Sequence, residues 1–462
     1  MEGIACRRLV LETVLRSGDF PSRRLAASLA KSEFSGRDRA LATEVLSGVL
    51  RRRRTLDAVF RPYSKRRTVE PAVLWTLRVA LYQHLFLDQV PTYAAFHETL
   101  EAARPQLGKA LPFVNAVLRA VERGGKWLPG EEASEEDQHR LPRGAGVWEF
   151  DRPILPSRNQ DLAAYLGTVF SYPDFLVARW LEPLGETGCR ARLQAGNRPP
   201  GIGLRPNVLR TRGQELEQLL NSHQIQVEPG PVPGSLCLAP GSGAVGDLPG
   251  FAQGWFSIQD PTSLATVQLA SPKAGERVLD LCAAPGGKAF AAWELMGGRG
   301  ELLACDRDAK RLARMEPEAA RLGHEVDIRH LVQASGMKAS SLQAKDGRPW
   351  DLVLLDVPCS NTGVLARRPE ARWRFSAESL KKMVQSQKRL TRWALPAVLG
   401  PETRVLWCTC SLEPEENLQA AERAARRGGL QVAESRLFEP GPKQAGGFAA
   451  LLVPSKSGKA GA

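Results

Sequence analysis

The sequence predicts a multidomain chain: an all-α domain first, a small α+β domain in the middle, and an α/β domain with a mostly parallel sheet last. Its 462 residues are too many for one ordinary core, because about 150 residues per domain is typical. Three patterns indicate this order. Apolar residues at helical spacing fill the N-terminal part, mixed helical and extended stretches follow, and strands alternate with helices from Trp255 onward.

The expected boundaries follow from these changes of pattern. We assign a helical domain, a linker, a middle domain, the α/β domain and a disordered tail to residues 1–128, 129–158, 159–250, 251–454 and 455–462.

The first segment is expected to form a helical bundle. Its apolar residues recur at steps of three and four positions, and breaks fall near Gly36, Pro62 and Pro91. The positions with this spacing are Leu41, Val45, Leu46, Val49, Leu50, Leu74, Leu77, Leu81 and Leu85. The acidic, Gly- and Pro-rich stretch GEEASEEDQHRLPRGAG that follows lacks this periodicity, so we interpret it as the linker.

The net charge of +13 is unevenly distributed along the chain. Residues 1–130 hold 22 Lys and Arg against 12 Asp and Glu. Cationic side chains gain affinity for polyanions by releasing counterions from phosphates, so the N-terminal domain is a candidate for nucleic-acid binding. A solvated basic helical surface is the alternative.

Composition excludes several classes of protein. No stretch approaches the ~18 apolar residues that a membrane span needs. The N-terminal MEGIACRRLVLETVL carries Glu2 and Glu12 and is expected to be an amphipathic helix, not a signal peptide. The 8 cysteines are scattered and indicate reduced thiols. We therefore expect a cytoplasmic protein without a membrane partner, and a monomer by default.

The α/β domain contains four apolar strand patterns, each followed by a helical one. They are RVLDLC, LLACD, DLVLLD and RVLWCTC. Strands alternating with helices are typical of a parallel sheet with helices on both faces. Sites in such sheets lie at the carboxyl ends of the strands.

The first strand end carries the motif RVLDLCAAPGGKAF, residues 277–290. Its glycines let the backbone approach a ligand closely, and a helix N-terminus follows. A merely structural turn is the alternative, and the motif matches neither GxGxxG nor a P-loop. Asp306 ends the next strand, LLACDRD, where a carboxylate can accept both ribose hydroxyls of a nucleoside. Together these features indicate a nucleoside cofactor.

Two further strand ends carry cysteines. Asp356 ends DLVLLD, and Cys359 follows it in the loop. Cys410 follows the strand RVLWCTC, and Glu413, Glu415 and Glu416 after it are expected to begin a helix. An arginine run with Trp373 is a candidate phosphate and base contact, or a solvated loop; its members are Arg367, Arg368, Arg372 and Arg374.

The paired cysteines have several explanations. Zinc is disfavoured because Cys-x-Cys is not a usual spacing and the nearest histidines are His324 and His330, so we expect no metal. A redox pair would show CxxC spacing. Two independent core cysteines, or covalent catalysis in which each thiol has its own task, are the remaining explanations.

These motifs together resemble the RNA cytosine-5 methyltransferase family. The resemblance rests on AAPGGK, the acidic strand end, DVPCSNTG with Arg-Arg-Pro-Glu and Trp after it, and TCSLEPEEN. RALATEVLSGVL, LRVALYQHLFLDQVP and PFVNAVLR resemble the NusB-like RNA-binding domain of the bacterial RsmB (Sun) branch, and the similarity runs over residues 5–453. It implies a Rossmann-like methyltransferase domain.

The resemblance also implies roles for individual residues. Cys410 would be the nucleophile, Cys359 would assist product release, Asp356 would engage the cytosine ring and Lys288 would be the active-site lysine. S-adenosylmethionine would be the cofactor, and RNA, expected to be small-subunit ribosomal RNA, the partner. The implied cofactor pocket comprises Cys282, Ala283, Ala284, Pro285, Gly286, Gly287, Lys288, Asp306 and Asp356.

One departure from the family pattern concerns the adenine end of the cofactor. The family usually has a Gly-Asp pair after the strand EVDIRHL, where this chain has VQASGMKAS. A non-catalytic RNA-binding assembly factor that keeps the fold is therefore the alternative. A DNA methyltransferase fits less well, because the pair of cysteines and the helical N-terminal segment are both more typical of the RNA enzymes that the chain resembles.

Overall fold

The computed structural model describes residues 2–16, 20–199, 201–239, 242–331, 342 and 347–455. The chain divides into two compact units. Unit 1 comprises residues 1–197 and 368–374, and unit 2 comprises residues 198–367 and 375–462. In the described residues no helix is both long and apolar enough to cross a lipid bilayer.

Unit 1 is mainly helical, as the sequence predicts. Its long helices are α1 (Glu2–Leu15), α2 (Pro21–Leu29), α3 (Gly36–Phe60), α4 (Pro71–Phe86), α5 (Thr92–Leu107), α6 (Leu111–Gly124), α7 (Leu162–Val169) and α8 (Asp174–Ala195). Short 3-10 turns, η1 (Arg61–Tyr63) and η2 (Gly108–Ala110), connect some of them.

The apolar spacing of the sequence becomes the core of this bundle. Along α3, Val45, Leu46, Val49 and Leu50 are buried, because positions three and four apart lie on one face of a helix. Ser35 caps this helix, since its side chain accepts a hydrogen bond from the Asp38 amide. The predicted helical domain is confirmed.

Residues 125–150 form a sheet where the sequence analysis expected mostly linker. The strands β1 (Gly125–Pro129), β3 (Gly146–Phe150) and β2 (Arg140–Arg143) pair antiparallel in that order. Trp148 anchors the sheet: its indole N–H donates to the Leu85 carbonyl at 3.1 Å. One buried tryptophan gives this polar segment a packed face, a contact that periodicity does not reveal.

Unit 2 is built on a seven-stranded sheet in the order β10-β9-β8-β11-β12-β14-β13. The strands β8 to β12 are parallel, and β13 and β14 run antiparallel at one edge. Their bounds are β8 (Arg277–Asp280), β9 (Glu301–Asp306), β10 (Asp327–His330), β11 (Leu352–Asp356), β12 (Arg404–Thr409), β13 (Leu430–Phe438) and β14 (Gly447–Pro454). The predicted mostly parallel sheet is confirmed.

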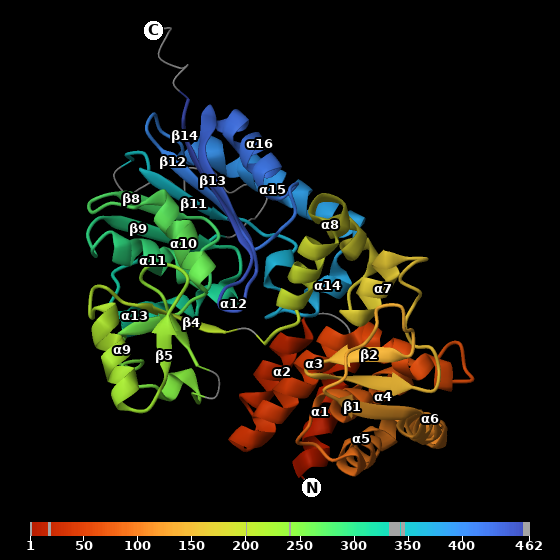
Figure 1. The fold of residues 1–462 in the computed structure, drawn as a ribbon. Coiled ribbons are helices and arrows are strands. Elements are labelled where there is room, and N and C mark those ends of the chain that lie inside the picture. The colour runs from red at the N-terminus through yellow and green to blue at the C-terminus, as the bar shows by residue number, and fades with distance from the viewer. Residues whose placement is uncertain are drawn as a thin grey trace. The chain divides into compact units, whose positions relative to one another are not determined.

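Helices cover both faces of this sheet (Figure 1). One face packs against α10 (Pro261–Ala270), α11 (Gly287–Leu295) and α13 (Met315–Leu322), and the other against α15 (Ala377–Val398) and α16 (Leu418–Gly428). Successive residues of β11 alternate between the two cores: Leu354 joins one and Leu355 the other. Such fully apolar strands are typical of a sheet buried on both sides.

A smaller antiparallel sheet of unit 2 has the order β5-β6-β4-β7. Its strands are β4 (Ile202–Pro206), β5 (Val227–Pro229), β6 (Leu236–Leu238) and β7 (Phe256–Ile258), and α9 (Gly213–Ser222) covers it. The expected small α+β domain is therefore present. Its expected start at residue 159 differs from the unit boundary, since α7 and α8 belong to unit 1.

Candidate active site

The parallel strands bring the candidate residues to one edge of the sheet. In the β11–β12 register Asp356 lies opposite Cys408, so Cys359 and Cys410 both follow the ends of neighbouring strands. The strand β8 pairs with β11 on one side and with β9 on the other. The strand ends that the sequence singled out are thus adjacent.

The loop of residues 282–288 is tied to the neighbouring strand β9 by its backbone amides. The Ala283 amide donates to the Cys305 carbonyl at 2.9 Å, and the Ala284 amide donates to Asp306 Oδ2 at 3.1 Å. Asp306 is buried at the predicted strand end, and its hydrogen bond to the Ala284 amide holds the loop in place.

Gly286 is the residue of this loop for which no other amino acid fits. Its φ is +104°, in the region that disfavours side chains, and a Cβ there would lie 2.4 Å from the Phe290 ring. The loop turns here into α11, which begins at Gly287. The predicted tight turn into a helix is confirmed.

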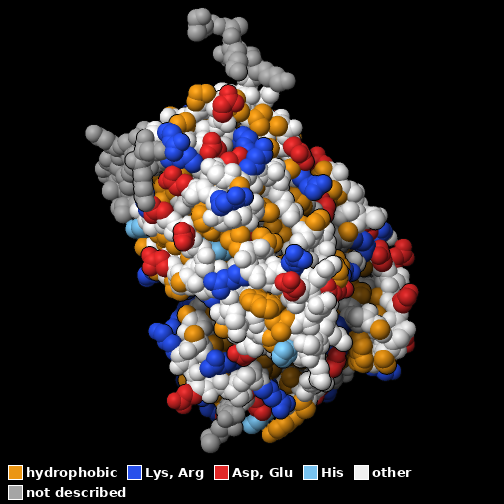
Figure 2. All heavy atoms as spheres, turned by 90° about the vertical axis from the view of Figure 1, so that its left-hand side faces the viewer, with side chains coloured by type: hydrophobic (Ala, Val, Ile, Leu, Met, Phe, Trp, Pro, Cys, Tyr) orange, Lys and Arg blue, Asp and Glu red, His pale blue; other side chains and the backbone are white. Residues whose placement is uncertain are grey.

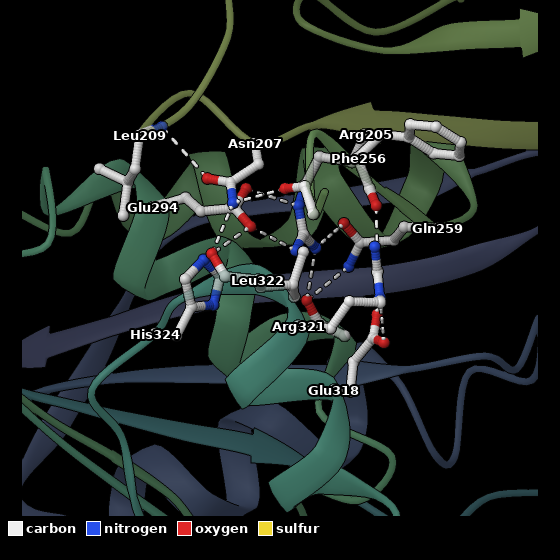
Figure 3. Close-up of polar contacts among 12 residues, drawn as sticks. Arg205, Asn207, Leu209, Phe256, Gln259, Glu294, Glu318, Arg321, Leu322 and His324 are labelled. Atoms are coloured by element: carbon white, nitrogen blue, oxygen red, sulfur yellow. Dashed lines mark hydrogen bonds and ion pairs between the residues drawn. The ribbon is translucent and has the colours of Figure 1, made fainter. Parts of the chain in front are cut away.

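A buried network fixes the start of α11, and the sequence analysis did not single out its members. The Gly287 carbonyl accepts hydrogen bonds from Arg205 Nη1 and Gln259 Nε2, each at 2.8 Å. Arg205 also forms a two-pronged ion pair with Glu294 of α11, at 2.8 Å for both bonds (Figure 3). His324 lies beside Glu294, and burial lowers its pKa to about 3, so the ring is neutral. Strand β4 thereby holds the residue that precedes Lys288.

Lys288 and Asp356 form a close ion pair, with 2.8 Å between Nζ and Oδ2. Burial lowers the pKa of Lys288, but the Asp356 carboxylate outweighs this effect, and the pKa lies above its ordinary value. The lysine also interacts electrostatically with Cys408 and Cys410. A positively charged ammonium group close to a cysteine favours the thiolate form of that cysteine.

The two cysteines predicted to share a site do so: their Sγ atoms lie 3.2 Å apart. Both are partly accessible, whereas Cys408, two positions before Cys410, is buried in the core. Asn361 Oδ1 accepts a hydrogen bond from Cys410 Sγ at 3.3 Å. The pKa of Cys359 is raised by its hydrogen bond to Cys410 and by burial. Two independent core cysteines are thereby excluded.

The acidic residues after Cys410 do not begin a helix, contrary to the sequence-based expectation. The helix α16 begins at Leu418, with Asn417 at its N-cap position. Glu416 is buried and accepts hydrogen bonds from Ser360 and Ser411 instead. Helix-dipole preference was therefore the wrong explanation for Glu416. Its carboxylate instead binds the serines that follow Cys359 and Cys410.

The arginine run, for which a phosphate and base contact and a solvated loop were the alternatives, is partly buried in the protein. Arg372 is fully buried in unit 1, where its guanidinium donates to the carbonyls of Arg51, Ser171 and Gly196 and to the Asn197 side chain.

The rest of the run is engaged with the protein as well. The Trp373 indole donates to the Leu50 carbonyl at 2.7 Å, within unit 1. Arg367 pairs with Asp260 at 2.8 Å, within unit 2. The guanidinium of Arg374 is exposed and stacks on the Phe20 ring, and Arg368 is half-buried. An arginine in a sequence does not reveal whether its guanidinium binds a ligand or pairs with carbonyl groups, carboxylates and rings of the protein itself.

Among the described residues, no group of three or more His, Cys, Asp or Glu side chains could hold a metal ion. The segment VQASGMKAS, where the family's Gly-Asp pair is missing, lies at residues 332–340, outside the described residues, as does most of the expected tail.

The edge therefore combines a glycine turn, an acidic strand end and a pair of thiols on a parallel sheet with helices on both faces. This combination is typical of a Rossmann-like fold of the nucleoside-cofactor class, with two thiols beside the candidate cofactor edge.

Comparisons with known proteins identify the family. A family model described as 16S rRNA methyltransferase RsmB/F matches residues 267–461, a NusB family model matches residues 7–123, and an RsmF/B-like ferredoxin-like domain matches residues 172–242. The chain is 31% identical to the probable ribosomal RNA small subunit methyltransferase B of Synechocystis sp. over 427 residues, which cover 90% of this chain and 87% of that protein.

Solved structures share the fold. PH0851 aligns with a TM-score of 0.70 and 22% identity over 98% of both chains. NSun6 from Pyrococcus horikoshii, solved with SFG, aligns with a TM-score of 0.53 and 19% identity, and covers 62% of this chain and all of its own. The chain belongs to the RsmB/F family of 16S rRNA methyltransferases, with a NusB-type N-terminal region and a ferredoxin-like middle domain.

Proposed function

We propose that the chain transfers a methyl group from S-adenosylmethionine to carbon 5 of a cytosine in 16S ribosomal RNA, through a transient bond between Cys410 and carbon 6 of the base. The observation that carries the proposal is the 3.2 Å separation of the Cys359 and Cys410 sulfurs at adjacent strand ends. The family and the names of its relatives support the RNA substrate.

The acidic strand ends suit a cationic nucleoside cofactor. Asp280, Asp306 and Asp356 interact electrostatically, and burial, followed by the Asp356 charge, raises the pKa of Asp280 to about 7. Asp280 Oδ2 is buried and accepts no hydrogen bond from any described residue. S-adenosylmethionine carries a sulfonium and an ammonium group, and it would supply an electrophilic methyl group at this edge. The SFG-bound NSun6 structure supports such a ligand.

Residues of the chain would hold this cofactor in the following way. Asp306 would accept the ribose hydroxyls, and the loop of residues 282–288 would lie along the ligand, since its backbone is fixed by β9 and by Arg205.

Cys410 would act as the nucleophile. Carbon 5 of cytosine is a poor nucleophile until a thiolate adds to carbon 6 and pushes electrons toward it. A free thiol has a pKa of about 8.5, so only a few per cent is thiolate at neutral pH. The Lys288 ammonium, which interacts electrostatically with Cys410, would favour the thiolate. Asp356, held by Lys288, would donate a proton to ring nitrogen 3 and so neutralise the negative charge that develops there.

Cys359 would complete the reaction. After methyl transfer, the Cys359 thiolate would take the carbon 5 proton, the electrons of that bond would form the ring double bond, and Cys410 would leave carbon 6 as a thiolate, which frees the methylated base. A raised pKa makes the Cys359 thiolate a stronger base for that proton. The cytosine must be unstacked to reach the site, so a single-stranded or looped RNA is the expected substrate.

Transfer of a labelled methyl group tests this function. Protein incubated with methyl-labelled cofactor should label protein-free 16S ribosomal RNA at cytosine and leave DNA unlabelled. RNA binding without any labelling would favour the assembly-factor alternative, and labelling of DNA would favour a DNA methyltransferase. A map of 5-methylcytosine in a deletion strain would identify the target nucleotide.

The accessory regions have proposed roles as well. Residues 1–128 would bind RNA through their exposed cations, and the ferredoxin-like domain would support the cofactor loop. We expect a cytoplasmic monomer, which light scattering and cell fractionation would test.

A further inference from the structure

We propose that Glu416 is a positioning residue that holds the two thiol-bearing loops together, and this inference rests on the proposed function. Glu416 belongs to no helix or strand, and its side chain is fully buried. A carboxylate is costly to bury without partners, so its contacts indicate what it does there.

The first contact of Glu416 is with the Cys359 loop. Its carboxylate accepts hydrogen bonds from the Ser360 amide at 3.0 Å and from the Ser360 hydroxyl at 2.5 Å. Ser360 directly follows Cys359, so two bonds fix the backbone and the side chain of the adjacent residue.

The second contact is with the Cys410 loop. The same carboxylate accepts a hydrogen bond from the Ser411 hydroxyl at 2.6 Å, and Ser411 directly follows Cys410. The two serine hydroxyls are also 3.0 Å apart. One carboxylate therefore bridges the residues that follow the two thiols, which lie 3.2 Å from each other.

A third group extends the bridge to the other side of Cys359. Gln387 of α15, itself buried, donates through Nε2 to the Pro358 carbonyl at 2.9 Å and lies 3.4 Å from Glu416 Oε1. Pro358 and Ser360 are thus both held, and Cys359 lies between them.

We call the Glu416 carboxylate with its hydrogen bonds to Ser360 and Ser411 the clamp, because it ties the Cys359 and Cys410 loops together. Hydrogen bonds to an ionised acceptor are stronger than neutral ones, and a buried acceptor leaves its donors no water to replace it. The reaction requires one thiol to attack the base while the other waits for its proton, and misplacement of reacting groups by about 1 Å can cost a hundredfold in rate. Glu416 holds the two loops through the serines, and its charge adds to the larger effects of the Cys410 hydrogen bond and burial that raise the pKa of Cys359.

A dithiol reagent tests the clamp without RNA or cofactor. Phenylarsine oxide captures two adjacent thiols by forming two sulfur–arsenic bonds and releasing water. Wild-type protein should bind one equivalent at Cys359 and Cys410. Glu416→Gln should reduce the rate of capture at least about tenfold, and Glu415→Gln, the matched neighbour, should not change it.

Kinetics provide the second readout. Glu416→Gln should lower kcat by about ten- to a hundredfold and leave KM for RNA within about twofold, since the clamp affects chemistry rather than RNA binding. In a Ser360→Ala, Ser411→Ala background the further loss caused by Glu416→Gln should be smaller, because both hydroxyl contacts are gone and only the Ser360 amide and Gln387 still donate to the carboxylate.

The outcomes are distinct. Unchanged capture in Glu416→Gln, or failure of the wild type to capture, would overturn the clamp. Full capture with no methylation by the wild type would leave the clamp standing and refute the proposed function. If Glu416→Gln does not fold, the paired serine variant is measured instead, and normal capture by that variant would also overturn the proposal.

Discussion

The candidate active-site edge of unit 2 and the arginine run around Arg372 in unit 1 both carry charged residues that the sequence singles out for ligand contact, and the structure places them in opposite environments. At the edge, Lys288, Asp356, Cys359 and Cys410 converge, and both thiols stay partly accessible. In unit 1, Arg372 is fully buried among carbonyl groups of the protein.

The consecutive arginines 51–54 also direct guanidinium groups at other parts of the protein, as Arg372 does. Arg53 stacks on the Trp75 and Trp373 rings, and Arg54 donates to the Tyr172 carbonyl and pairs with Asp174. Their charges are engaged within the protein. On the face drawn in Figure 2, Lys and Arg side chains are interspersed with acidic and apolar ones, without a continuous basic patch among the described residues. A cluster of like charges in a sequence is thus weaker support for a binding site than polar residues at strand ends.

Removal of the Cys410 thiol is the largest expected perturbation of the catalytic edge. Cys410→Ala should lower methyl transfer more than about a thousandfold, because no bond to carbon 6 can form. Labelled methyl transfer to RNA measures this loss. Cys408→Ala is the matched control: it lies two positions away in the core and should keep most of the activity. Near-normal methyl transfer by Cys410→Ala would show that the Cys410 thiol is not the nucleophile.

Loss of the second thiol should block release instead of attack. Cys359→Ala should accumulate a protein–RNA adduct that survives denaturing electrophoresis, because no group accepts the carbon 5 proton. The double variant Cys359→Ala, Cys410→Ala should form none. Normal turnover by Cys359→Ala would assign proton removal to another residue.

Asp280 sharpens the comparison, since its buried Oδ2 accepts no hydrogen bond from a described residue, whereas Nη1 and Nη2 of Arg372 both donate to the protein. Its pKa of about 7 lies above the value of 3.8 for a free carboxyl group. The folded protein therefore binds this proton more tightly, and the free energy of unfolding should fall as pH rises from about 4 to 7, by at most about 4 kcal/mol. Asp280→Asn should abolish this part of the dependence in urea titrations. The same pH profile in both proteins would contradict the burial of an uncompensated carboxylate.

Arg372 tests the opposite half of the comparison. Arg372→Met should destabilise unit 1 by about 3 kcal/mol, because several buried carbonyl groups lose their donor. Arg374→Met, in the same segment but exposed, should cost no more than about 1 kcal/mol. Urea unfolding followed by tryptophan fluorescence measures both values. Equal effects would indicate that Arg372 is not held as its contacts suggest.

The smallest effects are expected for cations that stay exposed. Lys65 and Arg67 lie on the surface of unit 1. If they contact phosphates, Lys65→Ala with Arg67→Ala should reduce the slope of log affinity against log salt by roughly 0.7–0.9 per cation. Arg119→Ala serves as the control, since Arg119 is paired with Glu122 at 2.8 Å. An unchanged slope would show that Lys65 and Arg67 do not contact phosphates.

The sequence predicted that the candidate residues share one edge of the sheet, because the positions of strand ends follow from the strand pattern. Asp306 and Asp356 end buried strands, and parallel strands share one edge, so their convergence needs no knowledge of side-chain packing. The paired thiols followed from the same argument.

What the sequence did not predict depends on partners that are distant in the chain. Arg372 bonds to the Arg51 carbonyl, 321 positions away, and Arg205 holds a carbonyl 82 positions away. Glu416 could have been suspected, because a serine follows each candidate cysteine and an acid lies nearby in the same loop. Neither periodicity nor charge encodes such long-range pairs.

The assignment of residues 368–374 to the N-terminal unit has a consequence for biosynthesis. A ribosome adds about 5–20 residues per second, so the helical unit waits roughly ten to thirty seconds after its main part has emerged before its last buried arginine is made. Until then the pocket for that guanidinium is exposed, and a truncated N-terminal fragment would carry it permanently. Adding residues 368–374 as a synthetic peptide would restore what the fragment lacks.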